Sequence, residues 1–205
     1  MRADDDEDDD KETPAAKEKE EAGLVPSPIQ NILFKARTVL LFGEISWKVA
    51  QSTVAQLLAL SEEGKGDIRL FINSQGGHVE SGDSIHDMIR FIGPKVKVIG
   101  TGWVASAGVH IFLAAKKENR FCLPNTRFMI HQPLGGAGGK ASDIEIEARE
   151  ILKMRERINR VIALETGQPI ERVAKDTDRN FWMSAEEAKA YGVVTHIVDS
   201  VKDVK

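Results

Sequence analysis

Short apolar runs alternate with segments of helical periodicity along most of the chain, and this alternation constrains the possible folds more than any other feature. Continuous apolar runs are typical of buried strands, and apolar side chains at helical spacing indicate helices. The predicted strands are Thr38–Phe42, Asp67–Asn73, Lys95–Gly100, Arg120–Leu123, Arg127–His131 and Val193–Val198. The predicted helices are Trp47–Leu60, Val79–Ile92, Ser106–Lys117, Ala141–Glu165, Ile170–Lys175 and Ala185–Tyr191. This order predicts one layered α/β domain with a mostly parallel sheet.

The N-terminal segment differs from the rest of the chain in its charge. Residues 1–22 hold 11 acidic and 4 basic residues and almost no apolar side chains, so burial cannot offset the entropy cost of ordering them. We therefore expect residues 1–23 to be a disordered acidic tail, either solubilising or binding a partner. The folded domain is expected over residues 24–200, after an extended segment at Pro26 and Pro28, and residues 201–205 are expected to form a C-terminal tail.

Composition narrows the class of protein. A chain of 205 residues with 41% hydrophobic residues is large enough to bury a core. Cys122 is the single cysteine, so no internal disulfide is possible, and no Cys/His cluster has zinc spacing. The sequence has neither a membrane-length apolar run nor an apolar N-terminal segment, and the folded part has no basic stripe. We expect a cytoplasmic protein that binds neither membranes nor nucleic acid.

Two segments contain candidate catalytic side chains. Ser106 stands among small residues where an apolar strand turns into a helix, and His131 ends a second apolar strand. A hydroxyl nucleophile needs a base within hydrogen-bond reach, and strand ends hold both rigidly. Each residue alone also has a structural explanation, because serine packs well between helices and strand-end histidines are common. His78 is a reserve candidate for the base.

The glycine pair after the second predicted strand is a third candidate segment. Gly76 and Gly77 let the backbone turn sharply and expose N–H groups, which can bind a developing oxyanion. The N–H of Ala107 is expected to join that of Gly77 in this role. An ordinary turn from strand to helix would have the same sequence, and a P-loop is excluded because its Lys-Ser/Thr pair is missing.

Seven motifs occur in order and together resemble one known family. They are Asn73–Gly77, Val104–Gly108, Phe121–Asn125, Met129–Gly136, Ser142–Ile146, Ala148–Leu152 and Asp176–Ala185. In this order they resemble the ClpP family, the proteolytic subunit of the ATP-dependent Clp protease, from about Val39 to Val198. The resemblance implies a crotonase-like fold of stacked ββα units with a protruding handle helix. It also implies two stacked seven-membered rings that enclose a degradation chamber.

The resemblance assigns roles by position. Ser106 becomes the nucleophile and His131 the base, and the oxyanion donors become the N–H groups of Gly77 and Ala107. Gly135–Gly139 and the helix over 141–165 match the handle that joins the two rings. No cofactor is implied for this subunit, because ATP would be used by a partner Clp unfoldase.

The third member of the triad departs from the family pattern. The family aspartate aligns with Asn180, whose amide oxygen can accept the Nδ1–H of His131 but cannot stabilise an imidazolium by charge. Asp176 and Asp178 lie nearby, but their spacing does not match the family position. Arg179 matches an arginine that pairs with the family aspartate across the ring interface. We therefore expect a weakened active site, with weaker coupling between assembly and activity.

Other departures concern the nucleophile loop and the unfoldase docking site. Gln75 stands where the family usually has proline, and Ala107 stands where it usually has methionine. The usual axial segment before the first strand is replaced by a shorter proline-rich run and the acidic tail. Arg69 replaces an aromatic residue of the hydrophobic docking pocket. The positions that stay apolar are Phe71, Phe91 and Phe121.

Two functions therefore remain open. The first is a serine endopeptidase that cleaves unfolded polypeptides inside a homo-oligomeric chamber, supported by Ser106 and His131. The second is a weakly active structural or regulatory ring subunit that assembles with an active paralogue, favoured by Asn180 and Arg69. A crotonase-type acyl-CoA enzyme would share the fold, but it does not need the serine–histidine pair.

Overall fold

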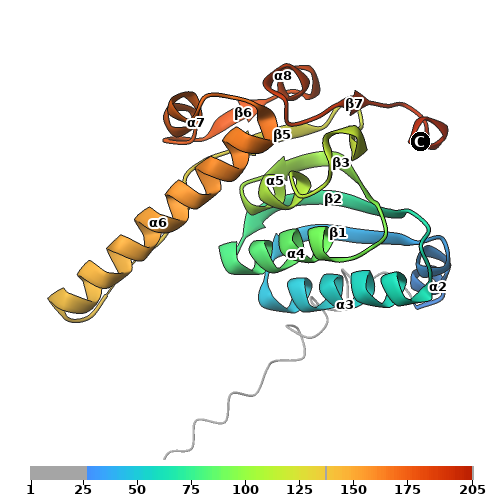
Figure 1. The fold of residues 1–205 in the computed structure, drawn as a ribbon, viewed down its shortest axis with the longest axis horizontal. Coiled ribbons are helices and arrows are strands. Elements are labelled where there is room, and N and C mark those ends of the chain that lie inside the picture. Colours follow the sequence, from blue (N-terminus) through green and yellow to red (C-terminus); the bar gives the residue numbers. More distant parts are fainter. Residues whose placement is uncertain (1–26, 137, 205) are drawn as a thin grey trace, which may run out of the picture.

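A seven-stranded sheet forms the centre of the domain. The computed structural model of the chain describes residues 27–136 and 138–204. Its strands are β1 (Thr38–Ile45), β2 (Ile68–Gly77), β3 (Val96–Ala105), β4 (Arg120–Cys122), β5 (Arg127–Ile130), β6 (Phe181–Met183) and β7 (His196–Ile197). The order across the sheet is β1-β2-β3-β4-β7, with β5 beside β3 and β6 beside β5, and only the β5–β6 pairing is antiparallel (Figure 1). The predicted, mostly parallel α/β domain is confirmed.

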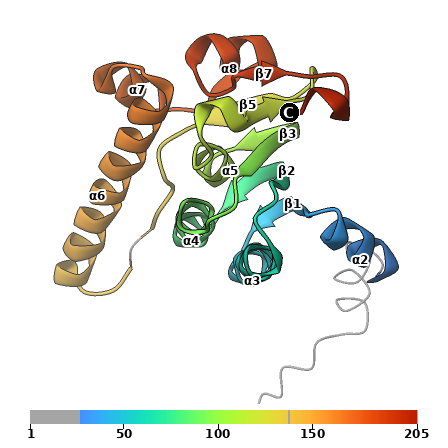
Figure 2. The same ribbon diagram turned by 45° about the vertical axis from the view of Figure 1, so that its right-hand side comes forward.

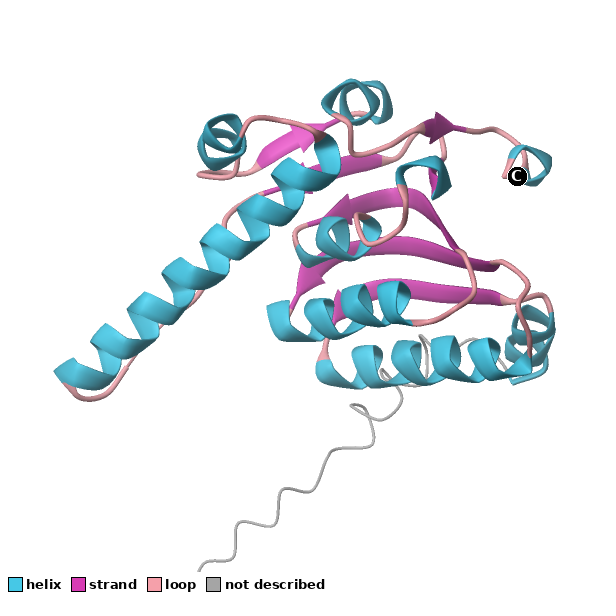
Figure 3. Cartoon of the chain, viewed as in Figure 1, coloured by secondary structure: helices cyan, strands magenta, loops and turns pink. Residues whose placement is uncertain are grey.

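Three helices follow the first three strands and cover one side of the sheet. The helices of the described region are α2 (Ser27–Lys35), α3 (Trp47–Glu63), α4 (Val79–Phe91), α5 (Ala107–Phe112), α6 (Ala141–Thr166), α7 (Ile170–Asp176) and α8 (Ala185–Tyr191), with 3-10 turns at Lys117–Asn119 and Val201–Asp203. Figure 3 shows α4 and α5 in front of the strands with α3 below them, and Figure 2 shows the three helices side by side. Leu57, Ile72, Ile85 and Val98 are fully buried where these layers meet.

Four sequence expectations need correction. The extended segment expected around Pro28 is instead the start of α2, because proline fits the first helical turn, where its missing N–H needs no partner. The helix expected over Ser106–Lys117 ends at Phe112. The last strand is reduced to His196–Ile197. The short strand β6 was not expected, because its three residues give too short a pattern to recognise.

Helix α6 projects from the body of the domain (Figure 1). Its buried residues, Asn159, Ile162 and Thr166, all lie in its C-terminal half. Its N-terminal half leaves Ile144 and Ile146 exposed, together with Leu152 farther along. These three apolar side chains are therefore uncovered within the single chain, whereas Ile162 near the C-terminal end of the helix is buried in the core. The expected acidic tail, residues 1–23, lies outside the described residues.

A buried arginine ties the C-terminal end of α6 to the domain. Arg120 is fully buried and donates hydrogen bonds to the backbone carbonyls of Leu113, Ala115 and Glu165. Its guanidinium also pairs with the Glu165 carboxylate, which accepts a second bond from Arg90 at 3.0 Å. Burial alone would raise the pKa of Glu165, but the two arginines outweigh it and lower the pKa. This charged cluster fixes the base of α6.

Candidate active site

Ser106 stands at a sharp turn between β3 and α5. Its backbone has φ 55° and ψ −122°, a conformation that non-glycine residues rarely adopt. The Ser106 N–H donates to the carbonyl of Met129 on β5 at 2.8 Å, which holds the turn against the neighbouring strand. Strained backbone of this kind persists where surrounding structure enforces it, and it is concentrated at functional sites. The turn places the serine side chain at the edge of the sheet rather than inside the helix.

Two glycines end β2, of which Gly76 makes room for the Ser106 turn and Gly77 allows the backbone of Ile45 on β1 to pass close by. A Cβ on Gly76 would lie 2.6 Å from the Cβ of Ser106, and a Cβ on Gly77 would lie 2.5 Å from the carbonyl oxygen of Ile45. Both glycines also have positive φ, 98° and 152°. The pair belongs to strand β2 itself, whereas the sequence suggested a turn after the strand. Gly76, to which the sequence gave no separate role, is the glycine that packs on the serine.

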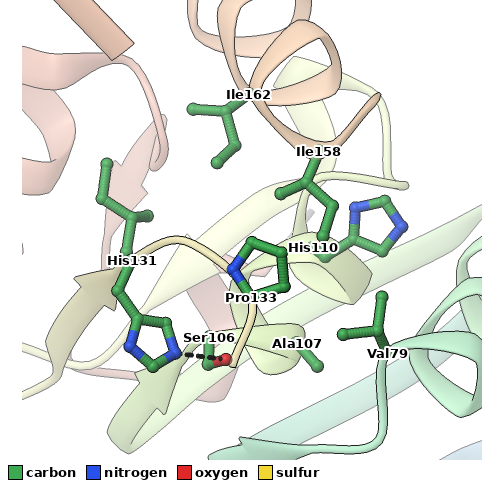
Figure 4. Close-up of a pocket in the computed structure, with 9 residues that line it drawn as sticks. Val79, Ser106, Ala107, His110, His131, Pro133, Ile158 and Ile162 are labelled. Atoms are coloured by element: carbon green, nitrogen blue, oxygen red, sulfur yellow. Dashed lines mark hydrogen bonds between the residues drawn. The ribbon is translucent and has the colours of Figure 1, made fainter. Parts of the chain in front are cut away.

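His131 follows the last residue of β5 and reaches both of its expected partners. Its Nε2 lies 2.8 Å from Ser106 Oγ (Figure 4). Its Nδ1 lies 3.0 Å from Asn180 Oδ1. An amide oxygen only accepts, so Nδ1 carries the proton, and Nε2 is left to accept from the serine hydroxyl. The structure therefore brings Ser106, His131 and Asn180 into one hydrogen-bonded chain.

The segments that carry His131 and Asn180 are joined by Gln132. Its backbone N–H donates to the carbonyl of Thr177, and its side-chain amide donates to the carbonyl of Asp178 at 2.8 Å. The aspartates considered as alternatives to Asn180 have other partners. Asp176 accepts a 3.0 Å bond from the Tyr191 hydroxyl, and Asp178 lies 3.6 Å from Arg155.

His78, the reserve candidate, has a structural role. Its Nδ1 caps α4 by accepting from the N–H of Ser81, and its Nε2 lies 3.3 Å from Glu80. Cys122 does not compete as a nucleophile, because burial raises the pKa of its thiol to about 12.

A mostly apolar pocket opens beside the nucleophile. Its lining includes Ser106 and His131. The other lining residues are Val79, Ala107, His110, Ile130, Pro133, Ile158 and Ile162. Figure 4 shows Ile158 and Ile162 pointing from α6 towards this space, with Pro133 below Ile158. Such a pocket suits an apolar side chain placed next to the serine hydroxyl.

Sequence reasoning missed a partly buried polar cluster next to this pocket. Asp83 on α4 forms two hydrogen bonds with Arg157 of α6, and its Oδ1 lies 2.9 Å from Nε2 of His110. The His110 ring also stacks on His86 at a centroid distance of 4.4 Å. Burial alone would raise the pKa of Asp83, but His110 and Arg157 outweigh it and lower the pKa, which keeps the carboxylate charged. No spacing rule links these residues in sequence.

Two of the residues expected in the docking pocket, Phe71 and Phe121, belong to a small apolar cluster. Ile99, Phe121 and Val198 are buried together, with Phe71 packed against them. Phe91, expected in the same pocket, lies at the end of α4 with 80% of its surface exposed. The guanidinium of Arg69 instead donates to the carbonyl of Ala36 at 3.1 Å.

Neither a metal site nor a membrane span is found in the part of the chain that the structure describes. Across residues 27–136 and 138–204, no three His, Cys, Asp or Glu side chains gather as metal ligands would. In the same ranges, no helix has both the length and the apolar character that crossing a membrane requires.

Comparisons with protein families, curated proteins and solved structures all find the same family. The model of the Clp protease family matches residues 21–201. The ATP-dependent Clp protease proteolytic subunit 3 of Rhizobium meliloti is 57% identical over 205 residues, which span all of both chains. The proteolytic subunit 2 of Gluconobacter oxydans is 57% identical over 181 residues, covering 87% of this chain and 81% of the relative.

Solved structures show the same likeness in three dimensions. ClpP1 from Listeria monocytogenes is 57% identical, with a TM-score of 0.78 over 86% of this chain and 99% of that one. An asparagine-to-aspartate mutant of the same protein gives 58% identity and a TM-score of 0.81 with the same coverage. The crotonase-like fold expected from the sequence is thereby confirmed.

Proposed function

Because the chain belongs to the Clp protease family and is a ClpP-like serine protease, we propose that Ser106, His131 and Asn180 form its catalytic triad. The observation that carries this proposal is the unbroken chain of hydrogen bonds, 2.8 Å and 3.0 Å long, that joins the three side chains. Nucleophile, base and orienting group are recognised by these roles and not by their order in the sequence. The protease domain is proposed to span residues 24–200.

The reaction follows from the hydrogen bonds. Ser106 Oγ attacks the carbonyl carbon of the scissile peptide bond while His131 Nε2 takes the hydroxyl proton. The tetrahedral intermediate then collapses, His131 donates that proton to the leaving amine, and an acyl-serine remains. Water, deprotonated by the same imidazole, hydrolyses the acyl-enzyme. Asn180 acts by keeping the Nδ1 proton in place, so that Nε2 always presents its lone pair to the serine.

The negative oxygen of the intermediate needs donors of its own. We assign these to the backbone N–H groups of Gly77 and Ala107, the last residue of β2 and the first residue of α5. The close packing of Gly76 on Ser106 supports this assignment, because it brings the end of β2 against the nucleophile. Fixed donors of this kind stabilise charge as it develops in the transition state.

Asn180 is expected to lower the rate without removing activity. Its oxygen fixes the tautomer of His131, but a neutral amide gives no ionic stabilisation to the imidazolium that forms during attack. The proposed function is therefore a serine endopeptidase with a Ser–His–Asn site and reduced turnover.

The assembly and partners are part of the same proposal. The exposed apolar side chains in the N-terminal half of α6, Ile144, Ile146 and Leu152, support two stacked seven-membered rings, in which the handle of one subunit is covered by a subunit of the other ring. Unfolded polypeptides are the proposed substrates. A Clp ATPase would deliver them, since the Rhizobium meliloti relative is named an ATP-dependent protease subunit. A cytoplasmic location belongs to this proposal, and no cofactor is assigned to the subunit itself.

Covalent labelling with a fluorophosphonate tests the chemistry, and native mass spectrometry tests the assembly. We expect one adduct on Ser106 in a ring-sized particle, and no adduct in the Ser106→Ala variant. A ring that takes no label would instead support the structural or regulatory subunit that assembles with an active paralogue. A stable monomer at micromolar concentration would refute the proposed assembly.

A further inference from the structure

The pocket beside Ser106 has walls on different helices. His110 belongs to α5, which follows the nucleophile, and Ile158 belongs to α6. Figure 4 shows the two side chains next to each other along the pocket. The distance between α5 and α6 at this level therefore sets how wide a side chain the pocket accepts.

A single carboxylate links both walls. Asp83 receives two hydrogen bonds from Arg157, at 2.6 Å and 2.7 Å, and Arg157 directly precedes Ile158 on α6. The same carboxylate lies 2.9 Å from Nε2 of His110. The Asp83 side chain is only 19% exposed and that of His110 5%, so the protein shields the carboxylate from most solvent, whereas the Arg157 side chain is 47% exposed.

We propose that Asp83 is a positioning residue that fixes the width of the apolar pocket by holding Arg157 of α6 and His110 of α5 together. This inference rests on the proposed function, in which the pocket receives the substrate side chain next to the scissile bond. A forked arginine–carboxylate pair restricts orientation as well as distance, because both nitrogens are held by both oxygens. Loss of the Asp83 charge frees α6 to move relative to α5 and widens the pocket.

Other contacts keep α6 folded onto the domain when Asp83 is changed. Asn159 Oδ1 accepts a 3.0 Å bond from the hydroxyl of Thr177, and Glu165 holds the buried Arg120. These contacts lie farther along α6 than Arg157, and Glu165 also accepts a 3.0 Å bond from Arg90 of α4, so the base of α6 stays attached to α4 without Asp83. The Asp83→Asn variant is therefore expected to fold and assemble, with a change confined to the pocket.

The test uses three peptidyl phosphonate diphenyl esters that differ only in the side chain beside phosphorus, which is that of Ala, Leu or Phe. The rate of adduct formation on Ser106 is separated into probe affinity and the rate of the covalent step. In the parent we expect Leu to be preferred over Ala. In Asp83→Asn we expect this preference to fall by about tenfold, the size of a lost pocket contact, through affinity alone. A small fluorophosphonate without a side chain should react unchanged.

Three further variants sharpen the test. Arg157→Gln should lower the preference for Leu over Ala as much as Asp83→Asn does, and Arg157→Lys should lower it less. The double variant Asp83→Asn/Arg157→Gln should lower this preference no more than either single variant. Arg160→Gln is the matched control, because Arg160 is exposed and pairs with Glu156 of the same helix at 3.0 Å. An unchanged Leu-to-Ala preference in Asp83→Asn would overturn the proposal. So would an equal loss of rate for every probe, since that indicates a general structural defect.

Hydrogen exchange separates this inference from the proposed function. If the parent takes no label at Ser106, the proposed function fails. In that case the positioning role is decided by the amides of residues 155–160. Faster exchange there in Asp83→Asn than in Arg160→Gln supports it, and equal exchange refutes it.

Discussion

Replacing Asn180 by aspartate should raise the rate of peptide cleavage. The structure places Asn180 Oδ1 3.0 Å from the Nδ1 of His131, so an aspartate of nearly the same shape would meet the imidazole in the same position. The substitution changes the charge of this contact and leaves the hydrogen bond in place. Because the imidazole becomes positive only as the hydroxyl proton is transferred, the new charge stabilises the transition state more than the ground state.

The size of the gain depends on how much water screens the pair. At 3.0 Å, two unit charges attract by about 1.4 kcal/mol in water and by about 5 kcal/mol at the lower dielectric of a protein surface. Asn180 is exposed, so the value in water is the better guide. About 1.4 kcal/mol corresponds to a tenfold increase in kcat.

Initial rates with a short fluorogenic peptide measure this gain, and labelling gives the concentration of active sites. Rates must be compared at equal oligomeric state, checked by native mass spectrometry, because the neighbouring Arg179 would gain an ionic partner and could tighten the rings. Asn180→Ala is the companion variant and should be slower than the parent, since it loses the group that fixes the tautomer. If the aspartate variant assembles equally and is no faster, the charge argument is wrong.

Three other substitutions test separate parts of the structure. Ser106→Ala should abolish both cleavage and fluorophosphonate labelling, and an undiminished label would assign the nucleophile elsewhere. Gly76→Ala should reduce the labelling rate by more than tenfold, because its Cβ would lie 2.6 Å from that of Ser106; an unchanged rate would contradict the packing described. Glu165→Gln should cost about 3 kcal/mol of unfolding free energy at pH 7 in urea titrations, because it leaves the buried Arg120 guanidinium without its counter-ion. Because the pKa of Glu165 is lower in the folded protein than its ordinary value of 4.5, its charged form stabilises the fold above pH 4.5. The difference in unfolding free energy between the parent and Glu165→Gln should therefore shrink as the pH falls below 4.5. A difference that does not depend on pH would refute this explanation.

Regular elements and the central pair of side chains were predictable from the sequence. Helix α8 has the predicted bounds, Ala185–Tyr191, because Ser184 caps its start and Gly192 ends it. Ser106 and His131 were singled out because each stands at the end of an apolar run, and parallel strands bring such ends to one edge of a sheet. Asn180 could be placed only through the family resemblance, since the loop before β6 has no local pattern.

The residues that were missed depend on long-range packing. The pair of Asp83 and Arg157 joins positions 74 residues apart and could not be found from spacing on either helix. The position of Ile158 in the pocket wall could not be predicted either, because the helical pattern indicates only that this residue lies on an apolar face. Helix α2 was missed for a local reason, because Pro28 predicts an extended chain as readily as a first helical turn.

The distribution of the three proposed catalytic side chains along the chain affects how the protein is made. Synthesis produces Ser106 first, His131 after 25 more residues, and Asn180 after a further 49. The backbone turn at Ser106 is held by β5, which does not exist until Met129 has left the ribosome. A partly synthesised chain therefore carries the nucleophile without the base and cannot attack other nascent proteins. Proteolytic capacity arises only with the last quarter of the polypeptide, when β6 pairs with β5.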